Sequence, residues 1–383
     1  MSIKQYQSYG KQFIDQDDIS SVIQVLKSDY LTQGPASQKF EKSITNYCKV
    51  NYSVTFSSAT AALHLSCLAL DLRAGDLVWT SPITFVASSN SVLYFGGKVD
   101  FIDIHPETFN IDVSKLEEKL ILAEKNGDLP KAIIVVHFGG ASCDLAKIKE
   151  LSNRFGFKII EDASHAIGAT YKGHIIGSCK YSDITVFSLH PVKIITAGEG
   201  GIATTNNQEY FEKMQRLRSH GLKRNDDFIF QKDEIWQYDQ LELGYNYRLS
   251  DIQAGLGISQ LEKIGRFVAK RNHLAEIYRY HLDAENTMYQ HVLKQSTSAY
   301  HLFVIQIEKK RNELFKYLRA NGIGAAIHYI PVYKLKHYQN LGFPYDYLEE
   351  TEKYFKTCLT LPLHYNMQEE DVKHVINCLK SFK

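Results

Sequence analysis

Residues 186–201 read Val186-Phe187-Ser188-Leu189-His190-Pro191-Val192-Lys193-Ile194-Ile195-Thr196-Ala197-Gly198-Glu199-Gly200-Gly201. This order predicts an apolar strand ending at Phe187, then a polar turn, then a second apolar run from Gly201 to Thr205. Lys193 stands between two apolar residues, and burial lowers the pKa of an amine because it disfavours the charged form. An uncharged lysine is a nucleophile that can form a Schiff base with an aldehyde or a ketone. The alternative is a lysine at a strand end that reaches out to water.

The composition is that of an ordinary globular protein. The 383 residues suit two domains, or one large domain with a smaller partner. Hydrophobic residues make up 44% and charged residues 23% of the chain. The net charge of +1 creates no field that favours nucleic acid or an anionic membrane, so we expect neither as a partner. A phosphorylated ligand would have to be held by local groups.

The chain shows no targeting pattern. Its first residues, MSIKQYQSYG, lack the basic-then-apolar order of a secretory signal, and no apolar run has the roughly 18 residues of a membrane span. The six cysteines are scattered, with no C-x-x-C pair: Cys48, Cys67, Cys143, Cys179, Cys358 and Cys378. This spacing disfavours a zinc site and a disulfide framework and fits a reducing compartment. We therefore expect a cytoplasmic protein without a membrane anchor or a bound metal.

Apolar residues predict strands alternating with helices over the first 218 residues. Helices are expected over residues 16–28, 36–48, 61–70, 85–95, 112–124, 145–155 and 208–218. Strands are expected over residues 53–56, 77–80, 99–104, 132–136, 158–161, 183–187 and 201–205. Short, continuously apolar strands between helices are typical of an α/β fold with a mostly parallel sheet covered on both faces.

Polar turns follow three of these strands, at residues 58–60, 162–165 and 188–193. Ligands of such sheets bind at the carboxyl ends of the strands. We therefore expect the three turns to meet at one site.

The remaining sequence predicts a second, smaller unit. Residues 223–240 are polar and irregular, which indicates a surface excursion. A long helix is expected over residues 252–283, capped by Ser250 or Asp251, and it leads into strands at 302–307 and about 325–329 around a helix at 313–321. This order predicts an arm over residues 1–12, a large domain over 13–255, and a smaller α+β domain over 256–383.

Several residues near the three turns have chemistry that suits a flat, phosphorylated ligand. Ser58 and Thr60 would offer hydroxyls and helix-terminal amides to a phosphate, or they are simply helix caps. Asp162 ends an apolar strand, where a carboxylate needs a partner such as a protonated pyridine nitrogen, or it caps a helix. His165 would bond a ring oxygen or cap a turn, and Phe85 would stack on a ring or pack in the core.

Together these groups predict a site for pyridoxal phosphate. Lys193 would form the Schiff base, and Asp162 would keep the ring nitrogen protonated so that the ring acts as an electron sink. The freed lysine would then move the proton between the substrate carbon and the cofactor carbon. His190, in the same turn as the lysine, is a further catalytic candidate. Asn246, between two tyrosines, would donate to a phosphate, or it is a turn residue.

Six stretches occur in order along the chain: SATAALHL, SPITFVAS, EDASHAIGATY, FSLHPVKIITAGEGG, LRSHG and ELGYNYRLSDIQAGLG. They resemble the DegT-type sugar aminotransferases, which are fold type I pyridoxal phosphate enzymes acting on nucleotide-linked keto sugars. The resemblance covers nearly the whole chain. It implies a large domain with a mostly parallel, seven-stranded sheet and a smaller C-terminal α+β domain.

The resemblance also implies roles for single residues. Lys193 is the Schiff-base lysine, Asp162 pairs with the pyridine nitrogen, His165 lies on the side of the ring hydroxyl, and Phe85 stacks on the ring. The residues implied around the phosphate are Ala59, Thr60 and Ser188, with Asn246 reaching the phosphate of the neighbouring subunit's cofactor. A homodimer with shared active sites follows. Some relatives carry histidine in place of the lysine and perform deoxygenation, so Lys193 favours transamination.

Within the family, the arm and the C-terminal pieces are most similar to enzymes of the pseudaminic acid pathway. Those enzymes aminate C4 of a UDP-linked 2-acetamido-2,6-dideoxy-4-keto-hexose with L-glutamate as the amino donor. The sugar-nucleotide residues implied are Tyr9, Asp29, Tyr30, Leu31, Thr32, Ala59, Ser188, Asn246, Ile327, His328, Tyr329 and Ile330. Close relatives often carry lysine where this chain has Ile330, and on the residues alone His328 is equally well a surface histidine at a strand end.

Other functions compete with this hypothesis. The enzyme could aminate C3 or C4 of another nucleotide-linked keto-deoxysugar. A non-catalytic regulator that binds a sugar nucleotide is disfavoured by the complete lysine constellation and by the lack of a basic face. A nicotinamide dehydrogenase is disfavoured because no G-x-G-x-x-G turn follows the first strand.

Overall fold

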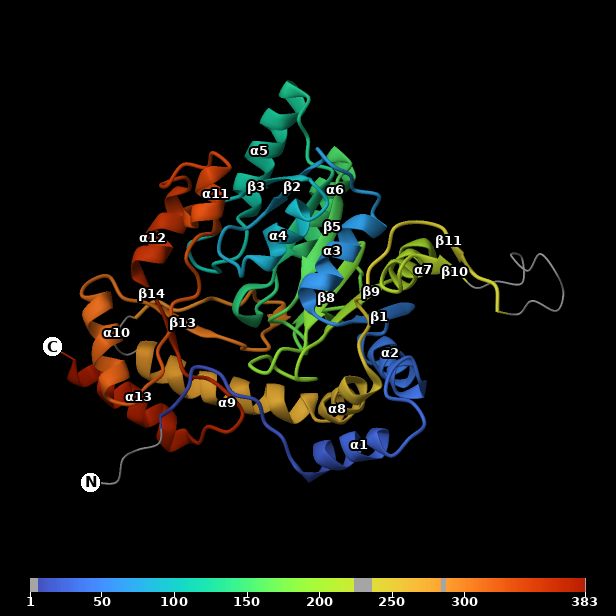
Figure 1. The fold of residues 1–383 in the computed structure, drawn as a ribbon. Helices are drawn as coiled ribbons and strands as arrows, with labels where there is room; N and C mark the ends of the chain where they lie inside the picture. Colours follow the sequence, from blue (N-terminus) through green and yellow to red (C-terminus); the bar gives the residue numbers. More distant parts are fainter. Residues whose placement is uncertain (1–5, 224–235, 284–286, 383) are drawn as a thin grey trace.

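A seven-stranded sheet lies at the centre of the computed structural model, which describes residues 6–223, 236–283 and 287–382 (Figure 1). Its strands are β1 (Tyr52–Phe56), β2 (Leu77–Thr80), β3 (Lys98–Phe101), β4 (Ala132–Val136), β5 (Lys158–Asp162), β8 (Ile184–Ser188) and β9 (Gly201–Thr205). They lie in the order β1-β9-β8-β5-β4-β2-β3. Strand β9 runs antiparallel to both of its neighbours, whereas the other paired strands are parallel. The predicted mostly parallel, seven-stranded sheet is therefore confirmed.

Helices cover both faces of this sheet because side chains alternate along each strand. In β4, Ala132 and Ile134 belong to one apolar cluster, and Ile133 and Val135 belong to another. Three helices complete the first cluster: α3 (Ala59–Ala69), α4 (Ala87–Leu93) and α7 (Gln208–Leu217). The second includes residues of α2 (Pro35–Cys48), α5 (Val113–Asn126), α6 (Leu145–Phe155) and α8 (Asp251–Glu262), and of the start of α9 (Ile264–Asp283). Burial on two faces explains why the strands are continuously apolar.

The C-terminal part has an apolar cluster of its own beside the central sheet (Figure 1). It is built from α9 (Ile264–Asp283), α10 (Arg311–Ala320), α13 (Glu369–Ser381) and the antiparallel pair β13 (Phe303–Gln306) and β14 (Cys358–Leu361). Two shorter helices, α11 (Lys336–Asn340) and α12 (Glu349–Thr357), precede β14. The domain boundary between residues 255 and 256 stays a prediction.

The remaining elements are short or lie at the periphery. Helix α1 (Gln16–Leu26) precedes α2, and the one-turn 3₁₀ helices are η1 (Phe138–Gly140) and η3 (Val332–Lys334). Two small ladders join β6 (Thr170–Tyr171) to β7 (His174–Ile175) and β12 (Ser296–Thr297), and β10 (Leu222–Lys223) to β11 (Asp239–Gln240). None of the helices in the described ranges has both the length and the apolar composition needed to cross a bilayer.

Two predicted elements are wrong. The single helix expected over residues 252–283 is two helices that separate at Lys263, whose buried ammonium is 2.9 Å from the carboxylate of Asp18 in α1. The strand expected near residues 325–329 is not formed, because Ala326 makes only an isolated bridge to Thr360 and Gly324 bonds to Gln7 of the arm. Residues 324–326 therefore make single hydrogen-bonded contacts with separate segments and no continuous strand ladder.

The irregular excursion predicted for residues 223–240 is wrong at its ends, where β10 pairs with β11. Its centre, residues 224–235, lies outside the described residues. The other predicted helices and strands of the first 218 residues agree with the structure within a few residues at each end.

Gly201, the first residue of β9, joins three segments of the chain. It pairs with Phe56 at the end of β1 and with Ser188 at the end of β8. A side chain here would overlap the carbonyl group of Ser58 and the amide of Ala59, so only glycine allows this approach. The turn after β1 and the turn after β8 therefore come together because residue 201 is glycine.

We predict that Gly201→Ala separates these two turns. Overlap of the new methyl group with backbone atoms should lower the free energy of unfolding by about 1–3 kcal/mol, measured by urea denaturation. The matched control is Gly265→Ala in α9, where an added methyl group meets nothing within 4 Å. That control should be neutral or stabilising by up to about 1 kcal/mol. Equal stability of the two variants would contradict the close approach.

Candidate active site

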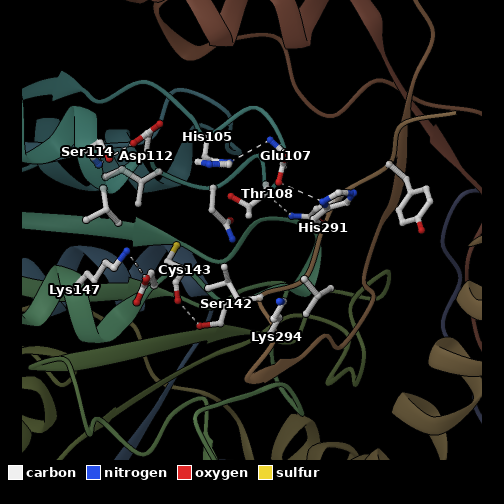
Figure 2. Close-up of a pocket in the computed structure, with 18 of the residues that line it drawn as sticks. His105, Glu107, Thr108, Asp112, Ser114, Ser142, Cys143, Lys147, His291 and Lys294 are labelled. Atoms are coloured by element: carbon white, nitrogen blue, oxygen red, sulfur yellow. Dashed lines mark hydrogen bonds and ion pairs between the residues drawn. The ribbon is translucent and has the colours of Figure 1, made fainter. Parts of the chain in front are cut away.

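One cavity of the described residues is larger than the cavity around Lys193 and does not contain the lysine. Its volume is about 620 Å³, and its wall comes from residues 105–114 and 142–147, from Arg279, and from residues 289–294 and 300. Figure 2 shows His105, Glu107 and His291 on this wall, where Nδ1 of His291 lies 3.4 Å from Oε2 of Glu107. None of the predicted site residues lines it. Size alone would therefore have indicated the wrong site.

A second cavity, of about 450 Å³, collects most of the predicted site residues. Those on its wall are Tyr9, Ser58, Ala59, Thr60, Phe85, Asp162, His165, Ser188, His190, Lys193, His328 and Tyr329. The three polar turns of the sequence do meet at the carboxyl ends of β1, β5 and β8, as expected. The register explains this, because Asp162 is paired with Val186 and Gly201 joins the ends of β1 and β8.

The other predicted residues lie outside this cavity: Asp29, Tyr30, Leu31, Thr32, Asn246, Ile327 and Ile330. Asn246 makes an isolated bridge to Ser219, and Thr32 makes one to Ser250. Tyr30 and Leu31 are about half exposed. The roles of these residues stay predictions, and so does that of His190, whose exposed side chain lines the cavity.

Helix α3 presents its N-terminus to the cavity. The hydroxyl oxygen of Ser58 accepts a hydrogen bond from the amide of Ala61 at 3.1 Å, so Ser58 is the helix cap that the sequence left as an alternative. The amides of Ala59 and Thr60 begin the helix, where backbone N–H groups have no intrahelical acceptor. These amides and the positive end of the helix dipole suit an anion such as a phosphate.

The carboxylate of Asp162 is buried and is held by two hydrogen-bond donors. The hydroxyl of Ser88 in α4 donates to Oδ2 at 2.6 Å, and the amide of Ser164 donates to Oδ1 at 3.1 Å. The hydroxyl of Thr84 lies 2.7 Å from that of Ser88 and extends the chain of hydrogen bonds. Asp162 forms no ion pair with the described residues, so the cavity can accommodate a cationic group beside it.

Alternation along β5 explains why Asp162 faces the cavity. Asp162 points to the face covered by α4, whereas the preceding Glu161 points to the other face. There, Oε2 of Glu161 lies 2.7 Å from Nε2 of His137, and Oε1 accepts from the hydroxyl of Thr185 at 3.1 Å. Adjacent carboxylates thus have separate partners on opposite sides of the sheet.

Lys193 has the environment that a nucleophilic amine needs. Burial lowers the pKa of its side chain to about 8, and the charge of Asp162 opposes this effect only in part. Its Nζ lies 3.5 Å from Nε2 of His301. About a tenth of the amine is therefore uncharged at pH 7, a far larger fraction than for a lysine in water.

Three histidines surround the amine. His165 accepts from the amide of Gly139 at Nδ1, 3.3 Å away, so its proton is on Nε2, which lies 3.3 Å from the hydroxyl of Tyr329. His328 bonds Thr360 through Nδ1 at 2.9 Å. Burial and the charge of Lys193 lower the pKa of all three histidines, so they are neutral near pH 7.

Phe85 lies at the cavity with 61% of its surface exposed. The nearest aromatic ring is that of Tyr329, 6.4 Å away between centroids and tilted by 57°. The core-packing alternative for Phe85 is therefore wrong. An exposed ring in a cavity wall is suited to stack on a flat ligand.

Three groups of the site were not predicted from the sequence: Thr84, Ser88 and His301. Ser88 lies three residues after Phe85, so helical spacing could have indicated that both face the same side. His301 precedes β13 in the C-terminal part, and nothing in its local sequence indicates contact with a residue 108 positions away.

These groups fit pyridoxal phosphate. The amine of Lys193 would form the Schiff base, Asp162 would hold the proton of the ring nitrogen, and Phe85 would cover the ring. The free amides at the start of α3 would hold the phosphate. The buried carboxylate without a cation is the observation that fits this cofactor best.

Comparisons with known proteins agree with this geometry. A model of the DegT/DnrJ/EryC1/StrS aminotransferase family matches residues 12–380. The UDP-4-amino-4,6-dideoxy-N-acetyl-beta-L-altrosamine transaminase of Campylobacter jejuni is 38% identical over 379 residues, which is 98% of this chain and 96% of that protein.

Solved structures show the same fold. Helicobacter pylori PseC, an aminotransferase involved in the biosynthesis of pseudoaminic acid, aligns with a TM-score of 0.90 at 31% identity over 99% of both chains. Spr1654 of Streptococcus pneumoniae in its PLP form aligns with a TM-score of 0.88 at 28% identity over 98% of both chains. Together with the residues of the cavity, these findings identify pyridoxal phosphate as the cofactor.

We predict that the attachment of pyridoxal phosphate to the apoprotein depends on the charge of Lys193. A base whose pKa is lowered by burial is uncharged above that pKa. Attachment, followed by absorbance, should therefore accelerate as the pH rises toward about 8 and level off above it. A rate that still rises steeply between pH 9 and 10 would contradict a buried amine.

Borohydride treatment of the holoenzyme should leave the mass of the reduced cofactor on Lys193 alone, measured by peptide mass spectrometry. Cofactor mass on any other lysine would refute the assignment.

Lys193→Ala should keep the melting temperature within a few degrees and lose turnover.

We predict that Ser88→Ala lowers kcat by about 10–100-fold, because a hydrogen bond to a charged group contributes about 1.5–3 kcal/mol. The matched control is Ser91→Ala in the same helix, whose buried hydroxyl donates to the carbonyl of Ser88 and not to Asp162. That control should change kcat less than about threefold. Similar losses in both variants would show a general effect on α4 in place of an effect on Asp162.

Proposed function

Because the chain belongs to the DegT/DnrJ/EryC1/StrS aminotransferase family, we propose that it transfers the amino group of L-glutamate to C4 of a UDP-linked 2-acetamido-2,6-dideoxy-4-keto-hexose. This places the enzyme in the pseudaminic acid pathway, where related proteins act. The observation that carries the proposal is Lys193, with a pKa lowered by burial, in one cavity with Asp162 and the free N-terminus of α3.

The chain supplies the proton handling of this reaction. Pyridoxal phosphate, when bound, supplies an electron-poor ring that stabilises negative charge on the carbon losing a proton. Asp162, fixed by Ser88 and Ser164, keeps a proton on the ring nitrogen. Lys193, near its pKa at physiological pH, both accepts and returns the proton at the reacting carbon.

The far wall of the cavity is suited to bind the sugar. The ring of Tyr9 in the arm lies 4.8 Å from that of His328, and both line the cavity. The carbonyl of His328 accepts from the hydroxyl of Tyr354 at 2.5 Å, and its Nδ1 is held by Thr360, so this side chain is fixed before a ligand arrives. A fixed aromatic and imidazole wall suits a pyranose ring with polar substituents.

We also propose a homodimer in which each subunit completes the site of the other. Asn246 lies outside the cavity of its own chain, although the family resemblance assigns it to a phosphate. Helix α1 exposes Ile19, Ile23 and Leu26, which helical spacing places on one face. An exposed apolar stripe supports an interface with a second copy.

The proposed location is the cytoplasm. The six cysteines are free thiols and are all buried. Free thiols are usual in proteins of a reducing compartment.

Product analysis tests the substrate. The holoenzyme is mixed with L-glutamate and each of a panel of UDP- and dTDP-linked 3-keto and 4-keto sugars, and the products are analysed by NMR. We expect amination at C4 of the UDP-linked 4-keto sugar and none with Lys193→Ala. Reaction only with dTDP-linked 3-keto sugars would refute the substrate and leave the aminotransferase chemistry intact.

A further inference from the structure

His301 is a buried histidine that contacts the amine of Lys193. Only 2% of its surface is exposed, and its Nε2 lies 3.5 Å from Nζ of Lys193. Its ring packs against that of His165, with centroids 4.3 Å apart. Its carbonyl oxygen accepts from the buried guanidinium of Arg271 at 3.5 Å. The ring of His301 is thus packed against a buried neighbour, and its backbone is held by a second one.

The second ring nitrogen of His301 has no hydrogen-bond partner. Its Nδ1 is buried, and no described residue bonds to it. A neutral imidazole carries one proton, on either nitrogen. A buried N–H without an acceptor is costly, whereas an unfilled acceptor is tolerated more often. The proton of His301 therefore lies on Nε2, from which it points toward the lysine.

A proton on Nε2 favours one charge state of the amine. An uncharged amine has a lone pair that accepts this hydrogen bond. An ammonium has no lone pair, and to find an acceptor in Nε2 it must drive the imidazole proton to Nδ1, where it has no partner. The orphaned Nδ1 therefore makes the ammonium less favourable than burial alone would.

The other groups near Lys193 do not change this preference for the uncharged amine. Asp162 at the end of β5 favours the ammonium, and burial opposes it. Protonation of His301 is disfavoured by burial and by the positive charges of Lys193 and Arg271. His301 thus remains neutral, and its tautomer follows the charge of the lysine.

We propose that His301 is a positioning residue that holds the uncharged amine of Lys193 at the cavity wall through a hydrogen bond from Nε2–H. The proposal depends on the role of Lys193 in the proposed function. A residue of the C-terminal part, His301, thereby acts on a site that is otherwise built at the ends of the strands. The hydrogen bond also explains why the lysine remains a nucleophile in the absence of the cofactor.

Competitive labelling of the apoprotein tests the proposal without substrate or turnover. Acetic anhydride is applied between pH 6 and 11, and the modified fraction of the Lys193 peptide is measured by mass spectrometry. The wild-type midpoint should lie at about 8. In His301→Gln the amide oxygen accepts from the ammonium without stranding a proton, so the midpoint should rise by about one pH unit and labelling at pH 7 should slow about tenfold. In His301→Phe the amine loses its donor but the ammonium gains no acceptor, so the midpoint should rise by less than in His301→Gln.

The matched control is His364→Gln. His364 is also a buried histidine with an unpartnered Nδ1, but it lies outside the cavity. Its replacement should leave the Lys193 midpoint unchanged. A midpoint in His301→Gln within about 0.3 pH units of wild type, or the same shift in the Gln and Phe variants, would overturn the proposal. Neither outcome would affect the borohydride and product experiments, so failure of this inference is distinguishable from failure of the proposed function.

Discussion

The close approach of Gly201 to the turn after β1 is the constraint on which the rest of the site depends. One residue of an antiparallel strand pairs with the ends of two parallel strands, and no side chain separates them. The amides that begin α3 and the turn that carries Lys193 thereby share one cavity.

Two ionisable side chains, Lys193 and Asp162, are buried in the cavity, and neither forms a closed ion pair. Lys193 is taken out of water and lies near only one carboxylate, so its pKa falls. Asp162 keeps its two donors and no cation, because Ser88 and Ser164 orient the oxygens but bring no charge. Both groups are more reactive toward a ligand than they would be as a closed ion pair. Burial of these two groups lowers the stability of the folded state. The extensive apolar clusters on both faces of the sheet offset that loss.

The site is completed by parts of the chain that fold around other clusters. His301, His328 and Tyr329 come from the C-terminal part, whose apolar residues pack around β13, β14 and three helices. Tyr9 comes from the arm. Contact between these parts and the sheet brings the imidazole of His301 to within hydrogen-bonding distance of Lys193, and the hydroxyl of Tyr329 to within that distance of His165. A shift of either part would therefore change the protonation of the lysine as well as the shape of the cavity.

The sequence by itself determined the alternation of strands and helices, the parallel sheet, and the three turns that carry Ser58, Asp162 and Lys193. These follow from local periodicity and from the rule that ligands bind at the carboxyl ends of strands. Only the tertiary structure decided that Ser88 holds Asp162, that His301 meets Lys193, and that residues 325–329 form no strand. Contacts between residues far apart in the chain depend on how the layers pack, and a local pattern carries no information about that packing.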